Sequence, residues 1–161
     1  MISRILLFSL SCLSLAACVQ DAAPEFCADH VQFHAEHAAS NAVMSVVMTE
    51  DGRVASEVQL PRDGFDESAT MALLQDVSNA YTLQTESECA STSIDVQTQD
   101  NKIVGKYSAE CGPDNKLAQV DVQLFESLPA LNEVEVSVVT PATKKHFAIN
   151  RQCASAIFRL E

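Results

Sequence analysis

The 161-residue chain has only four glycines, and none of them lies in a loop suited to holding a phosphate group. It contains no G-x-S-x-G sequence, the motif around the nucleophile of many serine hydrolases. It also contains no C-x-x-C pair, which weakens the case for a redox-active dithiol or a zinc knuckle. No motif therefore supports phosphate binding, serine hydrolysis or thiol redox chemistry.

The chain also lacks an apolar run long enough to span a membrane as a helix, which takes roughly 20 residues. Its longest apolar stretch is ILLFSLSCLSLAA, which follows Arg4. A charged start, a short apolar run and a small-residue end are typical of an export signal. We therefore assign residues 1–17 to a signal peptide and exclude them from the folded protein.

This signal ends in LAAC, Leu15 to Cys18. An aliphatic residue, two small residues and a cysteine resemble the lipobox of bacterial lipoproteins. The resemblance implies that signal peptidase II cuts before Cys18, whose thiol carries diacylglycerol and whose amino group is acylated, commonly with palmitate. Several acyl chains on one residue hold a protein stably to a bilayer. The likeness covers only the start of the chain, and we recognise no family of known activity.

Val19 follows the cysteine at the position where enteric lipoproteins of the inner membrane carry aspartate. The resemblance therefore implies an outer-membrane lipoprotein that faces the periplasm. Residues 18–24 are small and polar, so we interpret them as a lipidated tether. Residues 25–161 contain no second linker and are expected to form one domain.

Basic residues are scarce. Without Arg4, nine basic residues stand against 22 acidic ones, so the mature charge is 9 − 22 = −13. Such a chain is repelled by nucleic acid and by anionic lipid surfaces, which argues against both as partners. The charge permits a cationic partner or simple solubility, and it favours simple solubility because the charges are spread along the chain and form no run of like residues.

The first half of the mature chain predicts a helix, a hairpin and a second helix. Residues 25–40 are rich in Ala, His and Glu at helical spacing. Two β-branched runs then flank Asp51-Gly52, a strong hairpin signal. After a loop around Gly64, Asp66 is a candidate N-cap for a helix from about Glu67 to Ala80.

From Thr92 onward apolar and polar residues alternate, which predicts consecutive strands. A turn at Asp100-Asn101 sets these pairs opposite each other: Ile94 and Tyr107, Val96 and Gly105, Thr98 and Ile103. Across CGPDNK, the same alternation pairs Tyr107 with Val120 and Ile103 with Leu124. Across the next loop it pairs Val134 with Leu124, Val136 with Val122, and Val138 with Val120. It then adds Phe147 and Ile149, and finally Ala154, Ala156 and Phe158. A slip of one residue would turn the apolar side chains of a strand to the opposite face of the sheet. Since the successive pairings keep apolar residues on one face, we predict a six-stranded antiparallel meander.

The predicted fold class is therefore α+β. An antiparallel sheet of about six to eight strands, made of the meander and the early hairpin, is curved or partly closed and packs on one or two helices. Gly105 lies in mid-strand on the apolar face, where a glycine marks a bend or makes room for a neighbouring side chain. We expect a bend.

Four cysteines remain outside the signal and the lipidation site: Cys27, Cys89, Cys111 and Cys153. An even number in an exported chain indicates two disulfides, with three possible pairings. In the hairpin that pairs Ile94 with Tyr107, position 111 lies opposite position 90. We therefore predict that Cys89 pairs with Cys111, which leaves Cys27 for Cys153.

Three of the four histidines, His30, His34 and His37, lie in FCADHVQFHAEH. At about 100° per residue they share one stripe on the apolar side of the predicted helix. Neutral imidazoles at i, i+4 and i+7 can converge on Zn²⁺, Cu²⁺ or Ni²⁺. The stripe carries no acidic ligand, however, and the helix is expected to dock through Cys27. The pattern favours a structural role for these histidines, with a metal site as the alternative.

The densest acidic cluster is RDGFDE, with Asp63, Asp66 and Glu67. It lacks the ligand order of an EF-hand loop, so we interpret it as a turn that caps the second helix. Three functions remain open. The first, favoured by the anchor and the absent catalytic motifs, is a non-catalytic accessory or binding module without a cofactor, with a possible protein partner. The second is a metal-binding protein, and the third is an uncharacterised envelope enzyme.

Overall fold

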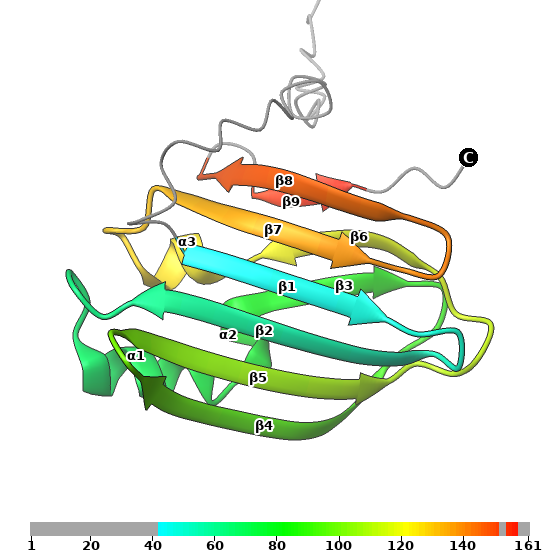
Figure 1. Ribbon diagram of the computed structural model, residues 1–161, viewed down its shortest axis with the longest axis horizontal. Helices are drawn as coiled ribbons and strands as arrows, with labels where there is room; N and C mark the ends of the chain where they lie inside the picture. Colours follow the sequence, from blue (N-terminus) through cyan, green and yellow to red (C-terminus); the bar gives the residue numbers. More distant parts are fainter. Residues whose placement is uncertain (1–41, 152–153, 158–161) are drawn as a thin grey trace, which may run out of the picture.

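The computed structural model describes residues 42–151 and 154–157. Figure 1 shows a large sheet with a smaller sheet behind it and short helices toward one end. The elements are β1 (Ala42–Met48), β2 (Arg53–Pro61), α1 (Glu67–Leu74), α2 (Val77–Ala80), β3 (Tyr81–Thr85), β4 (Ala90–Gln99), β5 (Lys102–Glu110), β6 (Leu117–Val122), α3 (Leu124–Ser127), β7 (Glu133–Val139), β8 (Lys144–Asn150) and β9 (Ser155–Ile157).

The large sheet has the strand order β4-β5-β2-β1-β7-β8, and the small sheet has the order β3-β6-β9. The predicted α+β class is confirmed. The large sheet does not close, because β4 and β8 each pair with one strand only among the described residues. One pairing differs in direction from the prediction, since β1 and β7 run parallel.

The core lies between the two sheets. Along β1 and β2, every second side chain is buried, as expected for strands with one face against the core. Met44 and Val58 from the large sheet and Val120 from the small one are fully buried in the same cluster. Each buried aliphatic side chain of this size contributes about 1.5 to 3 kcal/mol. Stacking of the two sheets therefore contributes to stability through many such side chains.

Three of the predicted hairpins, β1–β2, β4–β5 and β7–β8, are confirmed. Across β4 and β5, Ile94 lies opposite Tyr107 and Val96 opposite Gly105. The β1–β2 hairpin turns around Asp51-Gly52, and in β7–β8 Val136 lies opposite Phe147. In these three hairpins, strands joined by a short turn pair in the expected register.

The six-stranded meander is wrong. β5 pairs with β2 and not with β6, so Tyr107 lies opposite Ser56 and not Val120. β6 lies in the small sheet between β3 and β9, where Val120 faces Ala156. Leu124 belongs to α3 and not to a strand. Apolar alternation indicates which face of a strand is buried, but it does not identify the neighbouring strand, because several strands have the same alternation.

The predicted second helix is split in two. Asp66 caps α1 as expected, because its carboxylate accepts a hydrogen bond of 2.7 Å from the amide of Ala69. A second cap then interrupts the helix, since the carboxylate of Asp76 accepts a hydrogen bond of 2.9 Å from the amide of Ser78 and starts α2. Leu74, at the end of α1, is fully buried in the core.

None of the helices among the described residues is long and apolar enough to cross a membrane. The predicted helix over residues 25–40 and the pairing of Phe158 lie outside the described residues.

Gly105 lies in an uninterrupted stretch of the large sheet. Pairing continues through it on both sides, with Val58 on one strand and Val96 on the other. A Cβ atom at Gly105 would lie 2.5 Å from the hydroxyl oxygen of Tyr107, which donates a hydrogen bond of 3.0 Å to the carbonyl of Leu74. The glycine therefore makes room for the Tyr107 side chain, the alternative that we did not favour.

Candidate functional site

Most of the predicted site residues lie outside the described residues. These are the lipidation site Cys18, the predicted disulfide partners Cys27 and Cys153, and the histidines His30, His34 and His37. The structure therefore leaves the lipid anchor, the second disulfide and the histidine stripe as predictions.

Cys89 and Cys111 form a disulfide with an S–S distance of 2.03 Å, the pair that the hairpin register predicts. The bond lies where β4 begins and β5 has just ended. Asn115 supports this end of the sheet, because its side-chain amide donates hydrogen bonds of 2.9 Å to the carbonyls of both Ser87 and Cys111. The disulfide and Asn115 together hold the segments before β4 and after β5 next to each other.

The acidic cluster Asp63, Asp66 and Glu67 serves the loop and the helix, as interpreted from the sequence. Asp66 is the N-cap of α1, Asp63 accepts a hydrogen bond of 3.2 Å from the amide of Asn101, and Glu67 forms an ion pair of 2.6 Å with Arg62. Each carboxylate thus has a partner of its own within the fold.

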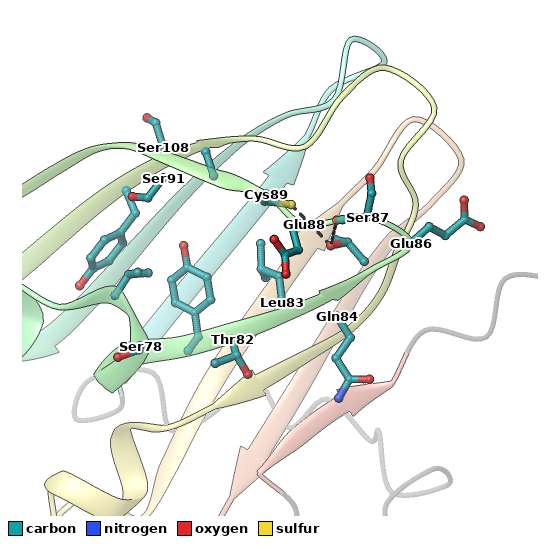
Figure 2. A pocket seen from close by; sticks show the side chains of 15 residues that line it. Ser78, Thr82, Leu83, Gln84, Glu86, Ser87, Glu88, Cys89, Ser91 and Ser108 are labelled. Carbon is teal, nitrogen blue, oxygen red and sulfur yellow. Dashed lines mark hydrogen bonds between the residues drawn. The ribbon is translucent and has the colours of Figure 1, made fainter.

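A groove of about 680 Å³ opens between β3 and the neighbouring ends of β4 and β5 (Figure 2). Leu83 and the start of α2 border its apolar part. The residues that line it are Val77, Ser78, Tyr81, Thr82, Leu83, Gln84, Thr85, Glu86, Ser87, Glu88, Cys89, Ser91, Tyr107, Ser108 and Ala109. This groove is not evident from the sequence, because it forms between strands of two sheets and the sequence does not predict the second sheet.

Two buried tyrosines form the wall of the groove nearest the core. The rings of Tyr81 and Tyr107 meet edge to face with centroids 5.7 Å apart. Tyr81 shares a short hydrogen bond with the hydroxyl of Ser56, and Tyr107 donates to the carbonyl of Leu74. Burial raises the pKa of both phenols, so both stay protonated at physiological pH. They offer the groove uncharged, already bonded hydroxyl groups.

The rim of the groove is polar and acidic. Figure 2 shows Glu88 extending over the groove, whereas Glu86 points away from it. Between them, the carbonyl of Ser87 accepts hydrogen bonds from Thr85, at 2.7 Å, and from Asn115, at 2.9 Å. This rim can attract a positively charged group.

The described residues offer few of the ligands that zinc prefers. Among them there is no group of three or more His, Cys, Asp or Glu side chains that could hold a metal ion. Their one histidine is His146, which is exposed on β8 opposite Ser137, and their two cysteines are bonded to each other. This part of the chain therefore does not fit a thiolate or imidazole zinc site of the usual kind.

A comparison with protein-family models matches residues 29–158 to the ZrgA family of zinc uptake proteins. The match spans more than half of the chain. The chain belongs to the ZrgA family. The matched region takes in all four histidines and every described strand. A comparison with curated proteins gave no match.

Membership of the ZrgA family corrects the sequence analysis, which recognised only the lipobox and no family of known activity. The sequence feature that points toward zinc is the histidine stripe, for which the sequence alone favours a structural role.

Proposed function

We propose that the protein is a non-catalytic, lipid-anchored zinc-binding protein of the cell envelope that serves zinc uptake from the periplasm. Membership of the ZrgA family of zinc uptake proteins carries the proposal. Zinc is the cargo, and no reaction is assigned to the protein.

We assign zinc binding to His30, His34 and His37, which lie inside the family match. Imidazole is a preferred zinc ligand, and spacings of i, i+4 and i+7 allow three rings to converge on one ion. Family membership supports this assignment over the structural role that the sequence alone favours. Three protein ligands leave one tetrahedral position to water or to a donor from another protein. Such an open site suits an ion that must be passed on.

Zinc titration of the purified, chelator-treated protein tests the assignment. We expect a one-to-one complex with a Kd in the micromolar range or tighter, measured by competition with a chromophoric chelator. The double substitution His30→Ala, His34→Ala should weaken zinc binding about 100-fold, because it removes two of three ligands. Binding should also weaken below pH about 6.5, where free imidazole takes up a proton.

His146→Ala is the matched control, because it removes a histidine that is exposed on β8. It should leave the zinc affinity unchanged. If His146→Ala weakens binding as much as the double substitution does, or if the double variant binds zinc like the wild type, the histidine assignment is wrong. Titrations with Cu²⁺ and Ni²⁺ show whether the site distinguishes zinc.

The proposed lipid anchor rests on the LAAC sequence. An anchor would hold a zinc uptake protein at the membrane that faces the periplasm. Cys18→Ser should leave the protein unprocessed or released from the membrane fraction, because the acylated thiol is lost. Cell fractionation and mass spectrometry of the mature N-terminus measure this. An unmodified N-terminus at another residue in the wild-type protein would show that the lipoprotein reading is wrong.

A further inference from the structure

We propose that the open edge of β4 binds an extended, basic segment of another envelope protein, which adds a strand to the large sheet. The proposal is independent of the assigned zinc ligands. It rests on the pairing, side-chain exposure and charge of β4.

β4 is the longest strand of the structure, with ten residues, and it pairs only with β5 among the described residues. Gln99 and Lys102 flank the two-residue turn and lie opposite each other, so they form the hydrogen-bonded pair of that turn. Hydrogen bonding alternates along an antiparallel strand. The backbone groups of Ile94 and Val96 therefore point away from β5. On that side β4 forms the edge of the large sheet (Figure 1).

This edge has little of the usual protection against another strand, with Asp95 as the one charged residue of β4. Natural edge strands carry lysine or proline, or are very short. The opposite edge of the sheet, β8, begins with Lys144 and Lys145, and β3 at the edge of the small sheet has five residues. β4 contains neither lysine nor proline, and its one bulge lies near its start, between Ser91 and Ser93. The remainder of the strand is suited to accept a partner.

The side chains of β4 indicate the chemistry of that partner. Ile94 faces the inner side of the sheet, like Tyr107 opposite it, yet is 38% exposed. Asp95 points to the outer side opposite Lys106, which already pairs with Glu57 at 3.9 Å. No ion pair of Asp95 occurs within the described part of the chain. A segment that alternates apolar and basic residues would cover Ile94 and pair with Asp95.

The acidic charge around β4 favours a basic segment of another protein over a second copy of this chain. Residues 86–100 carry four acidic side chains and no basic one, and the whole chain has a net charge of −12. A second copy of this chain would bring the same acidic edge to the interface. Residues 19–41 of the chain hold four acidic residues and no lysine or arginine, so they are not complementary either. A basic segment of another protein would be attracted to this edge, whereas a second copy of the chain or residues 19–41 would be repelled by it.

The proposal is tested with the mature protein isolated from the envelope. Its binding to a short synthetic peptide in which lysine and valine alternate is measured. A peptide in which glutamate replaces lysine is the control. We expect the basic peptide to slow amide hydrogen exchange at Ile94 and Val96, measured residue by residue by mass spectrometry. Asp95→Lys should weaken its binding about tenfold. Asp114→Lys, an equal charge change in the exposed loop before β6, should weaken it much less.

Several results would overturn the proposal. Slow exchange at Ile94 and Val96 without peptide would mean that a second copy or another part of this chain covers the edge. Equal binding of the acidic peptide, equal weakening by Asp95→Lys and Asp114→Lys, or protection of β8 in place of β4 would each assign the interaction to something else. No binding of the basic peptide at millimolar concentration would also contradict the proposal.

Discussion

Replacing Gly52 with alanine is expected to destabilise the protein strongly. Gly52 is buried in the β1–β2 turn with φ +77°, and its carbonyl accepts a hydrogen bond of 2.9 Å from the amide of Cys111. A Cβ atom there would lie 1.7 Å from the carbonyl oxygen of Gly112. Left-handed backbone costs other residues about 1 to 2 kcal/mol, and overpacking about 1 to 3 kcal/mol, so we expect a loss of about 2 to 5 kcal/mol in urea unfolding.

Gly64→Ala is the matched control for this prediction. Gly64 has φ +95°, but no heavy atom beyond its neighbours in the chain lies within 4 Å of its Cβ position. Its substitution therefore measures the cost of left-handed backbone without a steric clash. The excess loss in Gly52→Ala then measures how strongly the β1–β2 turn is held against the segment after β5. If both variants lose the same free energy of unfolding, the close approach to Gly112 contributes nothing.

The sequence predicts the pairing of consecutive strands where a short turn joins them, as in β1–β2, β4–β5 and β7–β8. Asp100-Asn101 gives the β4–β5 register because a tight turn leaves one way to align the strands, and Asp100 takes the left-handed conformation with φ 54°. In the β1–β2 turn, Arg53 donates to Asp51 over 2.7 Å and lowers the pKa of that carboxyl to about 2. Such local contacts are encoded within a few residues.

Pairings between distant strands were not predictable in the same way. Val120 and Val122 alternate correctly for a strand beside β5, yet the chain crosses from β5 to the small sheet. Alternation placed both valines in the core, where they are indeed buried, without identifying the neighbouring strand. The parallel pairing of β1 with β7 joins residues more than 90 positions apart, such as Ala42 and Val134, and no turn between them specifies it.

The candidate sites also differ in whether they depend on local sequence or on contacts between distant strands. The histidine stripe is visible in the sequence because its spacing is local. The groove between β3 and β5 and the open edge of β4 depend on which strands lie side by side, so they became visible only in the structure. Glu88 and Asp95 looked like ordinary acidic residues until the fold placed one on the groove rim and the other beside the open edge.

Removal of the disulfide by the double substitution Cys89→Ala, Cys111→Ala should cost about 3 kcal/mol, because the bond closes a loop with a sequence separation of 22 in the unfolded chain. Cys111 is 5% exposed and Cys89 packs against the core, so part of the loss reflects packing. Urea unfolding of the oxidised proteins measures it. The double substitution is preferable to a reducing agent, which would also break the predicted Cys27–Cys153 bond.

The slope of the unfolding free energy against urea separates the two contributions. A cross-link keeps the unfolded chain compact, so its removal should increase the slope, which follows the surface exposed on unfolding. Loss of packing alone leaves the slope unchanged. Asn115→Ala is a useful comparison, because it removes hydrogen bonds to Ser87 and Cys111 at the same end of the sheet but keeps the cross-link. A double cysteine variant with an unchanged slope and a loss no larger than that of Asn115→Ala would show that the bond contributes little, and that hydrogen bonds hold this end of β4 and β5 together.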